Sequence, residues 1–101
     1  MSVKVSIDED RRKKVIDALA QMRDGLLSED VILRAVLQTG RDTDRDTMRA
    51  DLTFLERAGC VLVTKLEIIN GEIWRVQLTD DGLRASQGHL LVAGVARRVV
   101  R

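Results

Sequence analysis

The 101-residue chain has no proline and no tyrosine, one cysteine, one histidine and only two aromatic residues, Phe54 and Trp74. A single cysteine, Cys60, excludes an internal disulfide and gives no metal cluster. Two aromatic side chains are too few for a platform on which single-stranded nucleic acid stacks. The sequence has no apolar run long enough to predict a membrane helix, and the N-terminal stretch is too polar for a secretory signal. We therefore expect a cytoplasmic protein without a membrane partner.

An excess of one charge is also missing, since 17 basic and 16 acidic residues give a net charge of +1. Domains that bind duplex DNA usually show a basic excess, so DNA binding here would need a local patch or the summed patches of a dimer. The lone His89, the absence of a glycine-rich phosphate loop and the absence of metal-ligand spacing argue against an enzyme. We expect no cofactor, no metal and one domain.

The most informative stretch runs from residue 43 to residue 78 and predicts a helix at 43–58 followed by a hairpin at 60–78. Thr43 is the expected N-cap, and Asp46 occupies the position of a capping-box acid. Gly59 is expected to end the helix in a left-handed conformation. The apolar residues at helical spacing form one buried stripe: Met48, Leu52 and Leu55.

The hairpin is signalled by two β-rich segments on either side of Asn70-Gly71. A two-residue turn at Asn70-Gly71 would place Glu67 opposite Trp74. A three-residue loop would place Leu66 opposite Trp74, Thr64 opposite Val76 and Leu62 opposite Leu78. We prefer the second register because it buries one consistent face. It also places Lys65 opposite Arg75 on the outer face, where either the diagonal Glu67 or an anion would relieve their repulsion.

Two helices are expected before this stretch and one after it. Ser6 and Glu9 form a capping box that would open the first helix, which Gly25 would end. The second would run from a Ser28 cap to Gly40, and the last from a Thr79 cap to Gly88. Val3 and Val5 would form an edge strand or a frayed arm, and Leu26 and Leu27 a short link with at most one β-bridge. The expected buried positions of the first two helices are Val15, Ile16, Leu19, Met22, Ile32, Leu33, Val36 and Leu37.

Two segments have a less definite reading. The basic run at 11–14 covers a full helical turn, so a solvated face balanced by the preceding acids is the favoured interpretation. The tail at 89–101 carries apolar residues without a clear period and three arginines, Arg97, Arg98 and Arg101. Such a tail packs either on its own domain, residues 1–88, or in a dimer.

The order of helices and hairpin resembles the winged helix-turn-helix family of transcription regulators. The residues that carry the resemblance are the helix ending Leu52-Thr53-Phe54-Leu55-Glu56-Arg57-Ala58-Gly59-Cys60-Val61 and the segment Leu78-Thr79-Asp80-Asp81-Gly82. The implied fold is mainly α with a β-hairpin: a three-helix core, a two-stranded wing, a short C-terminal helix and a tail. This pattern implies a fold more specifically than it implies a partner.

A closer likeness is to small proteins of Mu-like phages and prophages that are labelled as similar to arsenic-type repressors. It rests on the segment Arg45-Asp46-Thr47-Met48-Arg49-Ala50-Asp51-Leu52-Thr53-Phe54-Leu55-Glu56. The metal-sensing repressors carry a cysteine pair on the recognition helix, which this chain lacks, so metal sensing is not implied. The likeness places the protein in the cytoplasm of a bacterial host.

Three functional hypotheses follow. In the leading one, helix 43–58 enters the major groove of double-stranded DNA and the hairpin follows the phosphate backbone. Arg45 and Arg49 would read guanine, and phosphate contacts would come from Arg41, Thr43, Thr47, Lys65 and Arg75. The alternative for these two residues is that Arg45 and Arg49 pair with Asp46, Asp51 and Glu56 on a solvated face. The second hypothesis for the protein is a winged-helix interaction module in phage assembly or packaging that does not bind DNA directly. An enzyme is the least favoured hypothesis.

Overall fold

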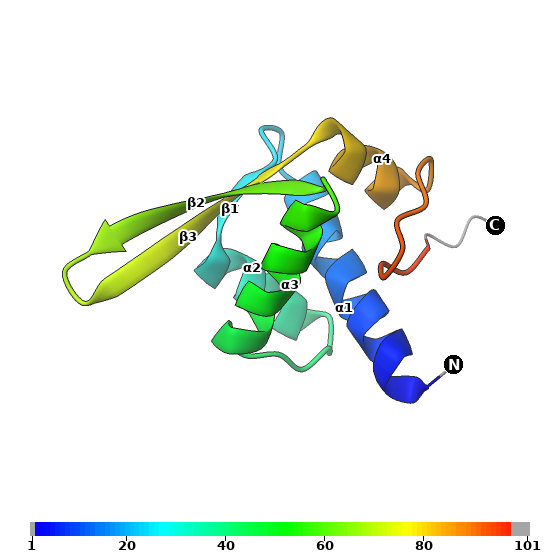
Figure 1. Cartoon of the computed structure of the whole chain (residues 1–101), viewed down its shortest axis with the longest axis horizontal. Helices are drawn as coiled ribbons and strands as arrows, with labels where there is room; N and C mark the ends of the chain where they lie inside the picture. Colours follow the sequence, from blue (N-terminus) through cyan, green and yellow to red (C-terminus); the bar gives the residue numbers. More distant parts are fainter. Residues whose placement is uncertain (1, 98–101) are drawn as a thin grey trace.

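The computed structural model describes residues 2–97, which form four helices and a three-stranded antiparallel sheet. The elements in chain order are α1 (Val3–Ala20), β1 (Leu26–Ser28), α2 (Glu29–Gln38), α3 (Arg45–Arg57), β2 (Val61–Ile68), β3 (Gly71–Leu78) and α4 (Asp80–Gln87). Figure 1 shows β2 and β3 as a long hairpin that projects beyond the helices. The mixed architecture contains the expected helix order and hairpin, with one additional strand.

The sheet has the order β1-β3-β2, so β3 is the central strand and β2 is an edge. The short apolar link is a true strand: Leu27 lies opposite Val76 on β3. β1 covers only the inner part of β3, which leaves the hairpin tip without a third strand. The sequence predicted a link with at most one bridge there, because three residues give too short a pattern to show alternation.

The core lies between the helices and the inner face of the sheet. Each of the first three helices contributes fully buried side chains, and the hairpin adds residues from its inner face. These residues are Val15, Ile16, Leu19, Ile32, Val36, Met48, Leu52, Leu55, Val61, Trp74 and Val76. The predicted stripes are therefore largely confirmed. Met22 and Leu37 are wrong, since they are 44% and 43% exposed: Met22 lies beyond the end of α1, and Leu37 lies in the last turn of α2.

Several helix ends agree with the sequence signals. Gly59 follows the C-cap residue of α3, Ala58, with φ of 81°, and Gly88 ends α4 with φ of 85°, both in the left-handed region that glycine adopts at least cost. The Thr79 hydroxyl accepts a hydrogen bond from the Gly82 N–H and so caps α4. Ser28 precedes α2 at the expected position, although its side chain makes no capping hydrogen bond.

Two predicted helix starts are wrong. α1 begins at Val3, capped by Ser2, whose hydroxyl accepts from the Val5 N–H; Ser6 is already inside the helix. Val3 and Val5 are therefore helical and exposed, not part of a strand. α3 begins at Arg45, and its cap is Asp44, not Thr43. A neighbouring aspartate competes effectively for the same position because its carboxylate is the stronger acceptor for helical N–H groups.

The preferred hairpin register is wrong by one residue. Ile68 lies opposite Gly71, Lys65 opposite Trp74 and Val63 opposite Val76, so the two loop residues are Ile69 and Asn70. Neither of the two weighed registers has these pairs. Asn70 has no positive φ, so the Asn-Gly turn that needs two such residues does not form. Burial of Val61 and Val63 against the helices decided the register.

The basic run at 11–14 is not a solvated face. Arg11 and Lys13 are buried, and the run pairs with acids of α1 and α3 through Arg11–Asp8, Arg11–Asp51, Arg12–Asp51, Lys13–Asp17 and Lys14–Asp10. The four side chains of the run point in different directions because they span a full helical turn, but α3 covers the side of α1 that carries the pairs with Asp51. The predicted balance by preceding acids is confirmed for Arg11–Asp8 and Lys14–Asp10, whereas the solvated face is wrong because Arg11 is buried against Asp51, which is far away in sequence.

The segment after α4 folds back along α1 (Figure 1). Val95 is buried in the core, the Ala96 N–H donates to the Glu9 carbonyl, and an Arg12 guanidinium N–H donates to the Gly94 carbonyl. Up to residue 97 the tail therefore packs on its own domain, which was one of the two predicted alternatives. Arg98 and Arg101 lie outside the described residues.

Candidate nucleic-acid interface

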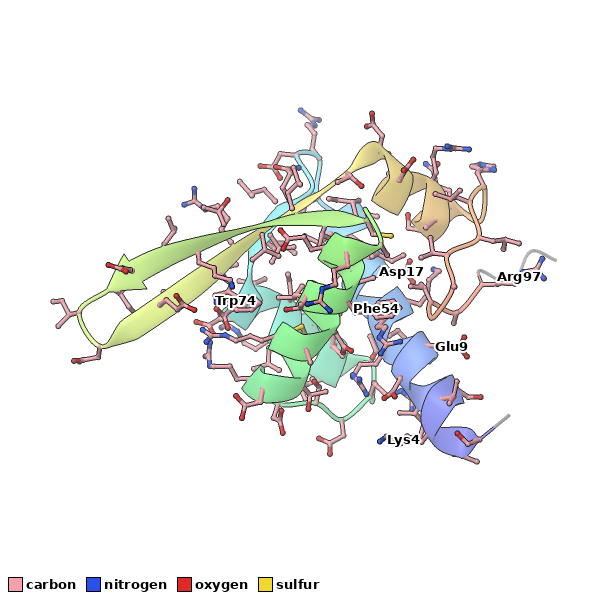
Figure 2. The ribbon with its side chains drawn as sticks, in the orientation of Figure 1. Lys4, Glu9, Asp17, Phe54, Trp74 and Arg97 are labelled. Atoms are coloured by element: carbon pink, nitrogen blue, oxygen red, sulfur yellow. The ribbon has the colours of Figure 1, made fainter. Side chains whose placement is uncertain are left out.

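A groove lies between the N-terminal half of α3 and the tip of the hairpin. Its lining combines charged residues of α2 and α3 with apolar and backbone groups of the two strands: Asp30, Arg45, Arg49, Ile68, Asn70, Gly71, Glu72 and Ile73. Figure 2 shows Trp74 at the inner end of this region, between the hairpin and α3. These are the two elements that the leading hypothesis places on DNA.

Glu29 is the buried acid on which the groove is built. Its side chain is 1% exposed and accepts two hydrogen bonds from Arg49, Nε to Oε1 at 2.8 Å and Nη2 to Oε2 at 3.0 Å. Arg45 Nη1 donates to Oε1 at 2.8 Å, and the Trp74 backbone N–H donates to Oε2. Glu29 thus joins α2, α3 and β3, and it satisfies a strand N–H just beyond the point where β1 ends.

These contacts determine the ionisation of Glu29. Burial raises the pKa of a carboxyl group, but the hydrogen bonds from Arg49 and Trp74 together outweigh burial, so the pKa of Glu29 lies below its ordinary value. The carboxylate is therefore charged at neutral pH, as a buried acid must be when it neutralises two guanidinium groups.

The two helix arginines have different environments. Arg49 is only 26% exposed; besides Glu29 it donates to the Glu72 carbonyl at 2.9 Å and lies 4.9 Å from the centroid of the Trp74 ring. The Arg45 side chain is 48% exposed, and it shares its guanidinium between Glu29 and Asp30. Arg49 is thus held in place by the fold, whereas Arg45 reaches the surface of the groove.

Lys65 completes the set of cations at this end of the molecule. Its ammonium group lies 4.6 Å from the centroid of the Trp74 ring, within the range of a cation–π contact. The indole N–H of Trp74 in turn donates to the Glu72 carboxylate at 2.9 Å. Lys65 and Trp74 face α3 because the observed register places them opposite each other on the inner face.

The described groups around Trp74 balance in charge. Three cations, Arg45, Arg49 and Lys65, lie close to three carboxylates, those of Glu29, Asp30 and Glu72. An incoming phosphate must therefore compete with carboxylates that already hold the guanidinium groups. Exposed ion pairs such as Arg45–Asp30 are weak and screened by salt, so this pair yields more readily than the buried Arg49–Glu29 pair.

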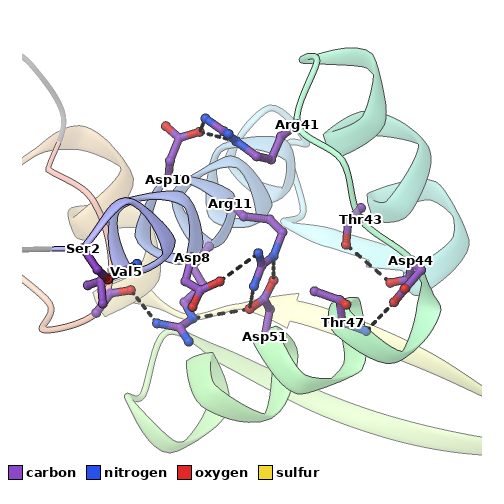
Figure 3. Close-up of polar contacts among 12 residues, drawn as sticks. Ser2, Val5, Asp8, Asp10, Arg11, Arg41, Thr43, Asp44, Thr47 and Asp51 are labelled. Carbon is purple, nitrogen blue, oxygen red and sulfur yellow. Dashed lines mark hydrogen bonds and ion pairs between the residues drawn. The ribbon is translucent and has the colours of Figure 1, made fainter.

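The remaining predicted DNA contacts do not gather into one patch. Arg41 pairs with Asp10 of α1, Nη2 to Oδ2 at 2.8 Å (Figure 3). Arg75 lies opposite Thr64 on the outer face of the hairpin, so it and Lys65 point to opposite sides. The predicted Lys65–Arg75 pair is thus contradicted by the register.

The N-terminal end of α3 carries acids beside its threonines. The Asp44 carboxylate accepts a hydrogen bond from the Thr47 N–H at 2.7 Å, which lowers the pKa of Asp44 (Figure 3). Thr43 is half-buried and donates to the Asp44 carbonyl at 3.4 Å. Asp46 is exposed in the same turn. Negative charge at the N-terminal end of α3 interacts favourably with the helix dipole, but it repels a phosphate group.

A second buried acid, Asp51, fixes α3 from its other side. It is 2% exposed and accepts from Arg11 Nη2 at 2.9 Å and from Arg12 Nε at 3.3 Å (Figure 3). Arg12 also lies 3.9 Å from the centroid of the Phe54 ring.

The sequence analysis missed both buried acids, Glu29 and Asp51. The available signal was position: Glu29 and Asp51 lie beside apolar positions that the core absorbs, where a solvated acid is unusual.

Other chemistry finds little support in the described part of the chain. Cys60 is fully buried, and burial together with the charge of Asp81 raises the pKa of its thiol, which disfavours the reactive thiolate. Residues 2–97 contain no cluster of three or more potential metal-ligating acids, histidines or cysteines. Over the same range, no helix has both the length and the apolarity of a membrane span.

Comparisons with known proteins add no information to this geometry. No protein-family model, no curated protein and no solved structure matches the chain.

Proposed function

We propose that the chain is a winged-helix protein that binds double-stranded DNA, with α3 as recognition helix and the β2–β3 hairpin as wing. The observation that supports the proposal best is the arrangement of these elements. α2, a short turn and α3 are followed by a hairpin that projects beyond the helices (Figure 1). Residues of α3 and of the hairpin tip line a groove. A duplex can offer its major groove to such a helix and its backbone to such a hairpin.

The contacts within this proposal follow from the environments of the two arginines. Arg45 is the base- or phosphate-contacting residue, because half of its side chain is exposed and its bond to Asp30 lies at the surface. Arg49 positions Arg45 by fixing the buried carboxylate of Glu29, whose Oε1 accepts from both arginines. Lys65 offers a phosphate contact from the inner face of the wing. A role in phage or prophage transcription remains part of the proposal and rests on the resemblance of the α3 segment.

Fluorescence anisotropy with random-sequence duplex DNA, at low and at physiological salt, tests the proposal. Wild-type binding is expected to weaken with salt, because cations on the protein release counterions from the duplex. Arg45→Ala should reduce the slope of log K against log salt by about one. Asp30→Asn should strengthen binding, because it removes one negative charge from the groove and frees Arg45. Absence of binding at low salt by both the folded wild type and Asp30→Asn would contradict the proposal.

The balance of charge supports a second candidate, a winged-helix protein-interaction module. The cations of the groove are matched by carboxylates, and Leu62, Leu66 and Ile68 expose 60%, 39% and 51% of their surface on the outer face of the hairpin. An exposed apolar stripe is typical of a protein contact. If neither the wild type nor Asp30→Asn binds duplex DNA, the interaction module becomes the favoured interpretation. Charge changes in the groove should then leave binding of the protein partner unaffected.

A further inference from the structure

The outer edge of β2 is the largest part of the sheet without a neighbouring strand. β2 is an edge strand, and the hairpin carries its distal half away from the helices (Figure 1). An edge strand offers a row of backbone N–H and C=O groups to another chain. We propose that this edge binds the same edge of a second copy of the chain, in an antiparallel pairing with its two-fold axis at Leu66.

The hydrogen-bond pattern of the sheet shows which β2 residues face outward. The Val63 N–H donates to the Glu56 carboxylate, not to β3, and the Trp74 and Leu78 N–H groups point toward the β1 side. In an antiparallel ladder such groups alternate. Lys65 and Glu67, which lie opposite Trp74 and Glu72, therefore direct their backbone groups to the free edge.

The charges on this edge select one register. With the two-fold axis at Leu66, Lys65 lies opposite Glu67 of the second copy, and this pair occurs twice. An axis at Lys65 or at Glu67 would instead place two like charges directly opposite each other, which is unfavourable. Lys65 and Glu67 are also the residues whose outward N–H and C=O groups would form the hydrogen-bonded pairs in the selected register.

The same register places apolar residues together on the outer face. Leu66 would lie against Leu66 of the second copy at the non-hydrogen-bonded position, where side chains approach most closely. Ile68 would lie opposite Thr64 on that face. Leu66 and Ile68 are otherwise 39% and 51% exposed, so pairing covers part of the apolar stripe. Self-complementarity of charge and of apolar surface in one register is what argues for a second copy over an unrelated partner.

The pairing has a natural limit. Glu56 already occupies the outward Val63 N–H at 2.8 Å, so the ladder would extend only over residues 64–68. Two overlapping hairpins of this length keep the helices of the two copies at opposite ends. The interface is small, and we expect association that depends on concentration, since a pairing of this size falls among weak interactions.

Sedimentation equilibrium from micromolar to near-millimolar concentration tests the proposal on the full chain. Wild type should shift from monomer to dimer. Glu67→Lys and Lys65→Glu should each raise the dimer dissociation constant by about tenfold, because like charges then face each other at two places. The double variant Lys65→Glu/Glu67→Lys should restore wild-type association. Arg75→Glu, a charge reversal on the central strand, is the control and should leave the constant unchanged.

Cross-linking gives a second readout at the proposed axis. Leu66→Cys should form a disulfide-linked dimer under a mild thiol oxidant, because non-hydrogen-bonded antiparallel pairs bring Cα atoms within disulfide range. Thr64→Cys should not, since it lies opposite Ile68. Cys60 is buried and gives no background. A monomer at the highest concentration, single reversals without effect, no recovery in the double variant, or equal cross-linking at both positions would each overturn the proposal.

Discussion

Arg49 holds Glu29 in a two-point ion pair across the junction of α2, α3 and β3, with Nε–Oε1 at 2.8 Å and Nη2–Oε2 at 3.0 Å. The sequence offered Arg49 as a base-reading residue, whereas the fold uses its guanidinium internally. This relationship distinguishes Arg49, a positioning residue, from Arg45, a surface residue, among the arginines of α3.

Arg49→Ala should destabilise the protein more than Arg45→Ala. Loss of Arg49 leaves the buried Glu29 carboxylate short of two hydrogen bonds, which costs about 1–3 kcal/mol. Arg45 is half exposed, so its loss should have only a small effect on the free energy of unfolding. Urea unfolding followed by circular dichroism measures both. Equal losses for the two variants would contradict the assignment of roles.

Asp51→Asn should lower the free energy of unfolding by about 3 kcal/mol, because the largely buried Arg11 guanidinium then lacks its main counter-charge. Asp8 still pairs with Arg11 and limits the loss. The double variant Arg11→Met/Asp51→Leu should recover much of the stability, since apolar residues of similar size often replace a buried ion pair without cost. Asp46→Asn, at an exposed position on the same helix, is the control. A double variant as unstable as the single one would indicate a different role for the pair.

The stability of the fold should decrease in acid partly through Glu29. Its pKa is lower in the folded protein than the ordinary value of 4.5, so the folded state binds fewer protons than the unfolded chain. The resulting stabilisation is complete above that ordinary value and is lost as the pH falls through the folded pKa. Urea unfolding at about pH 6 and about pH 3 should show a smaller decrease for Glu29→Gln than for wild type. Equal decreases would assign the acid sensitivity to other carboxylates.

Gly82→Ala should destabilise α4 by steric contact. A Cβ at Gly82 would lie 2.1 Å from the Cys60 carbonyl oxygen, a backbone atom that cannot move freely. The cost is expected at about 1–3 kcal/mol, typical of overpacking. Gly59→Ala is the comparison: its Cβ would meet nothing within 4 Å, and only the positive φ of 81° opposes it, at about 1–2 kcal/mol. Thermal unfolding ranks the two, and a tolerated Gly82→Ala would mean that α4 shifts away from Cys60.

Cys60 should not react with a thiol reagent in the folded protein. The side chain is fully buried and the pKa of its thiol is raised, so both access and thiolate formation are disfavoured. Absorbance with an aromatic disulfide reagent should report one thiol per chain in denaturant and almost none without it. Rapid reaction under native conditions would show that the α3–β2 junction opens.

Much of the fold was predictable because its signals are local. The stripe of Met48, Leu52 and Leu55 repeats at helical spacing, and Gly59 and Gly88 end helices in a conformation that other residues avoid. The hairpin was predicted from its composition, but not its register. Leu62 and Leu66 look as apolar in sequence as Val61 and Val63, and only packing against the helices shows which set is buried.

The candidate site depended on tertiary structure for a physical reason. A charged side chain gives the same local signal whether water or a distant partner compensates it. The decisive pairs join residues far apart in the chain, 16 positions for Arg45 and Glu29 and 40 for Arg11 and Asp51. The sequence by itself therefore determined that the helices and the hairpin exist and where α3 and α4 end, whereas α1 ends at Ala20 and not at the predicted Gly25. Tertiary packing decided which charges are buried, which face of the hairpin is exposed, and that Arg49 is held inside while Arg45 reaches solvent.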